Sequence, residues 1–505
     1  MANFEIKDGV AIIHESTTKI EHYTFENCAE FHSVVIPASV TEIGFKAFHN
    51  CTALQNVVIS EGVTKIGHNA FSGCSSLRCI EIPASTTTIE WGILNDCPAL
   101  ESIKVAEGNP VFDSRNECNA IIRTESNELI EGCKSTLIPS SITTIGVAAF
   151  SGCTGLTDIV IPNSVKTIKG SAFENCTGLT KIVIPASVEN IEQYSYNNYS
   201  GIFFQPFIGC TNLVDIVVDK ENSEYTSGEN CNAIMSKDAD VLYVGCATTV
   251  IPTSVRFIAQ CAFAGATMTE ITIPNSVEEI ESGAFSNCIN LRSVAFGKGL
   301  KSIKGRDYFF NKPAAFSNCK SLEAVVLPAS LNYVSTTPFE GCDKLCSIIV
   351  EEGNANYDSR NNCNAVIDTS SNVLKFGCKT TVIPESVVEI EEVAFKACNG
   401  LTDFTVPANV VKFGRQIFRD CRNLKSATIL GAVKDIDDPF YGCSSLETVT
   451  FGAGIKSMDE YIFDNSPALA RINVPAKKAA YYQKRLPQEV HHLIVEIELE
   501  KNAKK

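Results

Sequence analysis

Cysteine is the residue type in this sequence with the most chemistry open to it, because 22 of the 505 residues are cysteines. A thiolate can act as a nucleophile, bind a metal ion or exchange with a disulfide. Zinc sites commonly take their thiolates from Cys-x-x-Cys pairs, and the sequence contains no such pair. We therefore predict no metal centre and no cofactor.

Thirteen of the cysteines occupy one position of a repeat, which indicates a packing role. This anchor position holds Cys28, Cys51, Cys74, Cys97, Cys153, Cys176, Cys210, Cys288, Cys319, Cys342, Cys398, Cys421 and Cys443. Ala266 and Ser466 stand at the same position, so a thiol is not required there. Small buried thiols that pack as compact hydrophobic groups explain this pattern. So many thiols also favour a reducing compartment or an anaerobic source.

Six further cysteines form three pairs with a common spacing of 15 residues. The pairs are Cys118 with Cys133, Cys231 with Cys246, and Cys363 with Cys378. Their regularity makes them the best disulfide candidates in the chain, and the spacing is equally compatible with two separate thiols.

The seven histidines give little support to catalysis. They are His14, His22, His32, His49, His68, His491 and His492, so none lies between residues 69 and 490. A Cys–His or Ser–His pair needs an imidazole within hydrogen-bond reach of the nucleophile, which excludes such a pair from the centre of the chain. We interpret the histidines as surface turn residues.

One charged motif occurs twice. Asp113-Ser114-Arg115 returns as Asp358-Ser359-Arg360, whereas the related segment between them reads Thr226-Ser227-Gly228. A catalytic group would not be present in two of these related segments and absent from the third. We predict a turn held by the aspartate side chain, with an ion pair to the arginine.

The elements that position these residues follow from the repeat. Residues 28–50 and 153–175 both fit C-x-x-L-x-x-I-x-I-P-x-S-V-x-x-I-x-x-x-A-F, with Phe allowed at the Leu position. Leu-x-x-Ile-x-Ile predicts a short strand that the proline ends, and Ser-Val-x-x-Ile predicts a second extended segment on the opposite face. Ala-Phe fills the interior at the turn. One turn cannot bury its own apolar face, so the turns must stack.

Three intervals of 56 residues interrupt this rhythm, at residues 97–153, 210–266 and 342–398. Each holds a Cys-Asn-Ala segment, a polar turn and a second apolar run that ends at Gly-Cys, which predicts an inserted β-hairpin. The predicted fold is therefore a mainly β repeat solenoid of about eighteen coils of 22–23 residues, with short strands on both faces and three inserted hairpins.

This repeat resembles the BspA-type leucine-rich repeat, which occurs on surface and secreted proteins of anaerobic bacteria and some protists. The resemblance covers residues 5–475. It implies a curved leucine-rich-repeat array, roles in adhesion and protein binding, and no catalytic residues. Residues 1–16 do not read as a signal peptide, so the chain as written is expected in the cytoplasm. If a leader has been removed, the alternative is the cell surface or secretion.

Three regions are expected along the chain. Residues 1–27 form an N-terminal cap and a degenerate first coil, with a hairpin that turns at Lys7-Asp8-Gly9. Residues 28–475 form the solenoid. Residues 476–505 form a C-terminal cap, with a helix in 476–486, a stop at Pro487, a final strand and a tail.

Two aromatic inserts are the strongest candidates for a binding site. They interrupt the same repeat position, so both are expected on the same edge of the solenoid, either as the lips of a partner-binding site or as covers over its flank. The candidate residues are Tyr194, Tyr196, Tyr199, Phe203 and Phe204 in the first insert, and Arg306, Tyr308, Phe309 and Phe310 in the second.

A second candidate is an outward column of the predicted sheet. Its members are Val35, Val58, Glu81, Lys104, Val160, Val183, Val217 and Thr272. The column is richer in valine and threonine than a solvated face requires. Either strand propensity or an apolar stripe for a protein or peptide explains this composition.

The leading function is a non-catalytic scaffold, not an enzyme, that binds a protein partner or acts in adhesion. The alternatives are a structural protein that assembles with itself and a carbohydrate-binding module that holds a glycan. The net charge of −16 argues against nucleic acid, and no apolar run is long enough to span a membrane. We expect a monomer.

Overall fold

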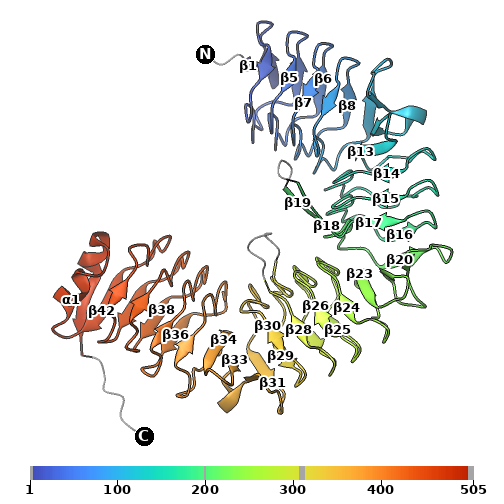
Figure 1. The fold of residues 1–505 in the computed structure, drawn as a ribbon. Coiled ribbons are helices and arrows are strands. Elements are labelled where there is room, and N and C mark those ends of the chain that lie inside the picture. Colours follow the sequence, from blue (N-terminus) through green and yellow to red (C-terminus); the bar gives the residue numbers. More distant parts are fainter. Residues whose placement is uncertain (1–3, 198–200, 306–312, 499–505) are drawn as a thin grey trace. The chain divides into compact units, whose positions relative to one another are not determined.

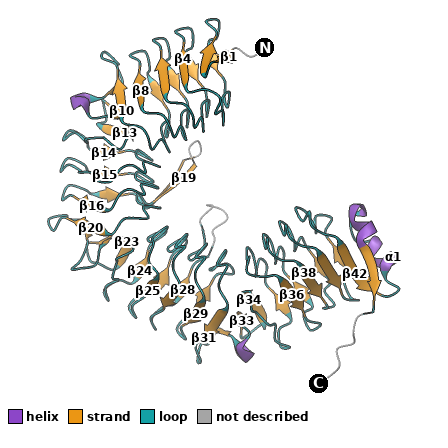
Figure 2. Ribbon diagram, turned by 180° about the vertical axis from the view of Figure 1, so that it is seen from behind, coloured by secondary structure: helices purple, strands orange, loops and turns teal. Residues whose placement is uncertain are grey.

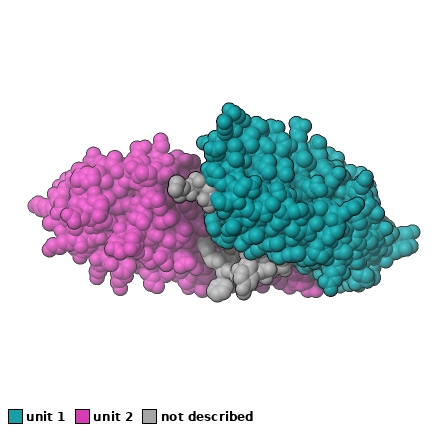
Figure 3. Space-filling model, turned by 90° about the horizontal axis from the view of Figure 1, so that it is seen from above, with its two compact units in different colours: residues 1–250, 260–266 teal, residues 251–259, 267–505 magenta. Residues whose placement is uncertain are grey.

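The computed structural model describes residues 4–197, 201–305 and 313–498. The chain forms two compact units, of which the first comprises residues 1–250 and 260–266, and the second residues 251–259 and 267–505 (Figure 3). Each unit is a stack of solenoid coils (Figure 1), which are called turns below. The chain has about 20 such turns of about 23 residues. The predicted solenoid with strands on two faces is confirmed.

In the first unit, one face carries strands of four residues. They are β1 (Phe4–Lys7), β2 (Val10–Ile13), β4 (Ser33–Ile36), β6 (Asn56–Ile59), β8 (Cys79–Ile82) and β10 (Ser102–Val105) in one sheet, and β16 (Lys181–Ile184) with β20 (Asp215–Val218) in another. The opposite face carries two-residue strands. They are β3 (Lys19–Ile20), β5 (Glu42–Ile43), β7 (Lys65–Ile66) and β9 (Thr88–Ile89), then β14 (Thr144–Ile145), β15 (Thr167–Ile168) and β17 (Asn190–Ile191).

The second unit has the same two kinds of strand. The longer ones are β25 (Glu270–Thr272), β27 (Ser293–Ala295), β29 (Ala324–Leu327), β31 (Ser347–Val350), β36 (Asp403–Val406), β38 (Ser426–Ile429), β40 (Thr448–Phe451), β42 (Arg471–Pro475) and β43 (Ile494–Ile497). The shorter ones are β24 (Phe257–Ile258), β26 (Glu279–Ile280), β28 (Ser302–Ile303), β30 (Tyr333–Val334), β35 (Glu389–Ile390), β37 (Lys412–Phe413), β39 (Asp435–Ile436) and β41 (Ser457–Met458).

The three 56-residue intervals each contain the predicted antiparallel hairpin, with a further short strand beside it. The strands are β11 (Phe112–Asp113), β12 (Ala120–Arg123) and β13 (Glu128–Gly132), then β21 (Tyr225–Thr226), β22 (Ala233–Ser236) and β23 (Val241–Gly245), then β32 (Tyr357–Asp358), β33 (Ala365–Asp368) and β34 (Val373–Gly377). We call these three segments the hairpin blocks.

One predicted strand is missing next to a hairpin block. The repeat at 153–175 was expected to form a strand before Pro162, but residues 156–161 form none. The preceding turn there is the end of the first block, residues 133–138, which is itself irregular and offers no strand to pair with. The long-strand face is therefore divided at the block.

Stacking of equivalent residues fills the interior of both units. Phe48 and Phe71 stack with ring centroids 5.1 Å apart and an interplanar angle of 9°. Phe150 and Phe173 repeat this at 5.1 Å and 4°. The backbone follows the same register, because the N–H of Phe48 donates to the carbonyl of Ala70 in the next turn at 2.8 Å. Each turn is thus held by its neighbours.

Eleven of the thirteen anchor thiols are buried, as predicted, Cys28 and Cys398 are half-buried, and most of the thiols also make a hydrogen bond. In ten turns the anchor side chain donates to the backbone carbonyl of the phenylalanine one turn back. The donors are Cys51, Cys74, Cys97, Cys176, Cys210, Cys319, Cys342, Cys421, Cys443 and, as a hydroxyl, Ser466. Sulfur–oxygen distances such as 3.1 Å for Cys176 suit this weak donor. Burial raises the pKa of the Cys210 thiol to about 12, so it keeps its proton.

The paired cysteines of the blocks are thiols. All 22 cysteines lie among the described residues, and none is joined in a disulfide. In the first block, the Cys133 thiol points to the carbonyl of Asn119 at 3.5 Å and the Cys118 thiol to that of Ala120 at 3.9 Å. Both side chains face backbone acceptors of the hairpin rather than each other.

The two ends have their own elements. Strands β1 and β2 form an antiparallel hairpin with the pair Lys7↔Val10 at its turn. At the other end, helix α1 (Ala479–Gln483) and a 3-10 helix (Gln488–Leu493) lie beside β42 and β43 (Figure 2). Pro487 precedes that 3-10 helix, which contains His491 and His492, and the final strand follows it.

In the regular repeat, the N–H of the interior phenylalanine donates to a backbone carbonyl of the next turn. Each hairpin block donates an N–H of its own to that carbonyl instead. In the first block the N–H of Gly132 donates to the carbonyl of Ala149 at 2.7 Å. The turn before the block needs another acceptor, and the buried Glu131 supplies it. One of its oxygens accepts the N–H of Ile93 at 2.7 Å. Burial raises the pKa of Glu131 to about 8, although backbone N–H groups around it oppose this shift.

The junctions at the other two blocks carry different residues. In the second block, the side-chain oxygen of Gln205 accepts the N–H of Phe207 at 2.7 Å, and its amide nitrogen donates to the carbonyl of Cys261 at 3.3 Å. In the third block, Phe376 stands where Glu131 does in the first, and a buried ion pair joins Lys396 to Glu340 at 3.1 Å nearby.

Replacing an anchor thiol should distinguish the hydrogen bond from simple packing. Cys176→Ala removes the donor to Phe150, and we expect a loss of about 1–2 kcal/mol in the free energy of unfolding. Cys176→Ser keeps a donor, as Ser466 does naturally, and should lose less. Urea unfolding measures both. A serine variant no more stable than the alanine variant would show that the bond contributes nothing.

Glu131 should make stability depend on pH. Its pKa is higher in the folded chain than the usual 4.5, so the folded state binds more protons between the two values. Its contribution is complete below 4.5 and is lost as the pH rises through about 8. We expect a fall of up to about 1.4 kcal/mol per pH unit in that window, and a shallower fall in Glu131→Gln. Parallel pH profiles for the two proteins in urea unfolding would contradict this role.

Candidate functional site: the outward strand face

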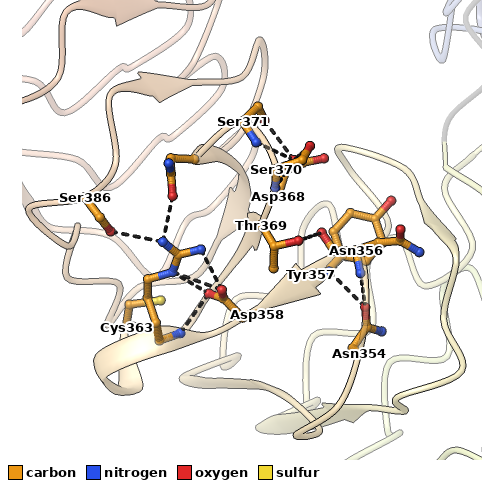
Figure 4. Close-up of polar contacts among 12 residues, drawn as sticks. Asn354, Asn356, Tyr357, Asp358, Cys363, Asp368, Thr369, Ser370, Ser371 and Ser386 are labelled. Carbon is orange, nitrogen blue, oxygen red and sulfur yellow. Dashed lines mark hydrogen bonds and ion pairs between the residues drawn. The ribbon is translucent and has the colours of Figure 1, made fainter.

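The repeated Asp-Ser-Arg motif is a structural turn, as predicted. Asp358 accepts the N–H of Arg360 at 3.1 Å, and its other oxygen meets the guanidinium at 2.6 Å (Figure 4). Arg360 also donates to Asn372 at 2.7 Å and to Ser386 at 3.3 Å. The guanidinium therefore ties the start of the third block to the turn after it.

The first block repeats this arrangement with Asp113 and Arg115. Although burial opposes it, hydrogen bonds from Arg115 lower the pKa of Asp113, so the carboxylate stays charged. Both groups are occupied by structural partners, which leaves neither motif as a reactive centre.

The first aromatic insert forms a hairpin that projects from the stacked turns of the first unit (Figure 1). Strands β18 (Tyr194–Asn197) and β19 (Gly201–Phe204) are antiparallel, and Tyr194 pairs with Phe204 and Tyr196 with Ile202. Phe203 lies opposite Ser195 in this hairpin.

The other five candidate residues of the two inserts are not among those that the structure describes. They are Tyr199, Arg306, Tyr308, Phe309 and Phe310. A joint site formed by the two inserts therefore stays a prediction.

An exposed apolar column is the clearest surface feature of the first unit. Ile12, Val35 and Val58 are direct neighbours across β2, β4 and β6, and all three side chains point outward. Glu81 and Lys104 interrupt the column as a cross-strand pair on β8 and β10. Leu137, Val160 and Val183 continue it at 23-residue intervals. We call these aliphatic residues the apolar column.

Strand propensity does not account for Leu137 and Val160, the two members of the column that lie outside strands. The most exposed aliphatic side chains of the described chain are Val160 at 77%, Leu137 at 73%, Val382 at 71% and Val250 at 67%. None of the four lies in a strand. Leu137, Val250 and Val382 occupy the same position in the three hairpin blocks. A contiguous row of exposed aliphatic side chains is the type of surface that contacts a partner.

The repeat register also produces an aromatic row that the residue types alone did not reveal. Tyr23, Phe45, His68 and Trp91 lie in successive turns, with ring centroids 5.1, 5.4 and 3.8 Å apart. Burial lowers the pKa of His68, which is half-buried against Trp91 and not the surface residue expected. The signal was present in the spacing of these positions, which is 22 residues and then twice 23.

Other kinds of site find no support in the described part of the chain. No three His, Cys, Asp or Glu side chains gather there in an arrangement that could hold a metal ion. Among the same residues, no helix is long and apolar enough to cross a membrane.

The apolar column should be dispensable for folding. We expect Val160→Ser to change the free energy of unfolding by less than about 0.5 kcal/mol, because its side chain is exposed. Val165, in the same turn, is fully buried, and Val165→Ala should lose about 2 kcal/mol. If both variants lose equal stability in urea, Val160 serves the fold and not a partner.

Several solved structures are similar to this chain. A leucine-rich repeat protein from Eubacterium ventriosum is 21% identical, with 66% of this chain and 91% of that chain covered and a TM-score of 0.36. A leucine rich cell surface protein from Faecalibacterium prausnitzii is 22% identical, with 95% and 88% covered and a TM-score of 0.31. Among curated proteins, no sequence matches the chain.

The comparison with family models covers most of the chain. The model of the BspA type leucine rich repeat region matches residues 10–117, 126–226, 243–366 and 371–484. These ranges contain the anchor positions and most strands of both kinds, and the gaps between them fall within the three hairpin blocks. The chain belongs to the BspA-type leucine-rich-repeat family.

Proposed function

We propose that this protein is a non-catalytic scaffold that binds a protein partner through the apolar column of its first unit. The exposure of Val160 and Leu137 outside any strand carries the proposal, because neither packing nor strand propensity explains these residues. The hairpin of β18 and β19, which projects from the same unit, is the second candidate contact.

The chemistry of the polar groups supports a binding role over catalysis. Anchor thiols such as that of Cys176 donate hydrogen bonds within the core, and the two Asp-Ser-Arg motifs are satisfied internally. Along the opposite face, charges are paired between turns, as in Lys19–Glu42 at 3.2 Å and Lys65–Glu90 at 3.1 Å. Exposed ion pairs of this kind favour solubility. The apolar column, by contrast, is the surface whose outward side chains are left for contacts with a partner.

Site-specific photocrosslinking in the source cells tests the proposal. A photoreactive phenylalanine derivative is placed at Val160, and a control is placed at Lys166, whose side chain is 60% exposed in the same turn. We expect position 160 to capture one defined protein species that position 166 does not. Equal capture at both positions, or none at position 160, would show that the column does not bind a partner.

Two further measurements separate the alternatives. A crosslinked species with twice the mass of this chain would indicate self-assembly, which a concentration-dependent mass in light scattering would verify. Retention on a glycan array that Val160→Ser leaves unchanged would assign sugar binding to another surface.

A further inference from the structure

The long-strand sheet of the first unit opens between two of its strands. Strands β4 and β6 share four residue pairs, and so do β8 and β10. Between β6 and β8 only Asn56↔Cys79 is paired. The N–H of Arg78 reaches the carbonyl of Gln55 at 3.4 Å, whereas the corresponding bond from Gln55 to His32 is 2.8 Å long. The carboxyl-terminal halves of β6 and β8 are therefore not paired with each other.

A groove of about 380 Å³ lies at this opening. Val57, Val58 and Ile59 line it on β6, and Ile80 and Glu81 line it on β8. The groove reaches the interior of the turn, because Val57 and Ile59 are each 8% exposed. Their equivalents on the fully paired β4 are 0% exposed. The apolar column runs into the groove at Val58.

The open ends of the two strands are held by a side chain in place of the regular proline turn. Ser60-Glu61-Gly62 replaces the Pro-x-Ser of other repeats. The Glu61 carboxylate accepts the N–H groups of Ala84 and Ser85, each at 2.9 Å. Gly62 has φ of +117°, and a Cβ there would lie 2.3 Å from the carbonyl oxygen of Ala38. The opening is thus part of the fold of these turns.

We propose that the groove between β6 and β8 docks an extended segment of a partner polypeptide. The unpaired strand halves present backbone donors and acceptors at the spacing of a β-strand, which is the recognition pattern of another polypeptide backbone. The apolar lining accepts a side chain of that segment, and the cross-strand pair Glu81 and Lys104 offers one charge of each sign at the rim. This inference rests on the proposed function and states where the partner polypeptide binds and through which contacts.

Other ligand classes fit these contacts less well. Glu61 and Glu81 disfavour the phosphates of nucleic acid. The groove has no aromatic side chain in its lining on which a sugar ring could stack. An extended peptide is the ligand whose backbone and side chains use both the open strand edges and the apolar floor.

The test uses a phage library of random peptides of about 12 residues, selected on the full chain. Enriched peptides are then titrated by calorimetry against the wild type, Val58→Lys and Val35→Lys. Both valines point outward at the same repeat position, with similar exposures of 53% and 49%, but only Val58 lines the groove. Cys79→Arg is a second variant, on the opposite wall, at an exposed position.

We expect enriched peptides to bind about tenfold or more weakly to Val58→Lys and to Cys79→Arg, and unchanged to Val35→Lys. Far-ultraviolet circular dichroism checks that each variant is folded. Failure to enrich any peptide, or equal affinity for all three variants, overturns the proposal. So does a change in self-association of Val58→Lys in sedimentation, which would assign the groove to a second copy.

The two proposals fail separately. If Val160 captures a partner in cells while Val58→Lys leaves peptide binding intact, the scaffold function stands and the groove has no part in it. If groove peptides behave as expected while Val160 captures nothing, peptide docking stands and the wider column does not bind.

Discussion

The structure depends on one constraint, the 23-residue register that sets each residue against its equivalent in the next turn. A single turn has too little apolar surface to bury and leaves its backbone groups unmatched. Stacking solves both problems together, because Phe48 lies on Phe71 while its N–H meets the carbonyl of Ala70. The anchor thiol adds a side-chain bond between turns at the same place. Cysteine suits that place because a small, protonated, apolar group fits beside the ring stack.

The turns that differ from the regular repeat lie where this 23-residue register is interrupted. A hairpin block takes over the carbonyl that the preceding turn would use, and Glu131 and Gln205 supply replacements from different sides of the junction. The same interruption removes the strand before Pro162 and leaves Val160 exposed. Between β6 and β8 a smaller lapse opens the groove. Departures from the repeat therefore place apolar groups and free strand edges at the surface, which a perfectly regular stack would hide.

The sequence was sufficient for the repeat, the two strand faces, the hairpin blocks and the role of the Asp-Ser-Arg turns. Each of these is a local pattern that recurs, so neighbouring copies verify one another. Glu131 was not foreseen because Val244 and Phe376 occupy its position in the other blocks, and its role comes from the junction. The groove was not foreseen either, since residues 56–59 and 79–82 both look like ordinary strands. The pairing of strands depends on how the next turn ends, here at Glu61 and Gly62, and a linear pattern does not show that.

The central claim is that the outward strand face of the first unit, at β6 and β8, binds a polypeptide. Hydrogen–deuterium exchange on the full chain with a saturating enriched peptide measures this most directly, because a docked backbone slows exchange at the strand edges it covers. The account predicts slower exchange in residues 56–61 and 79–83, with the buried turns around Phe150 and Phe173 unchanged. Protection confined to the hairpin of β18 and β19, or spread evenly over the unit, would contradict it.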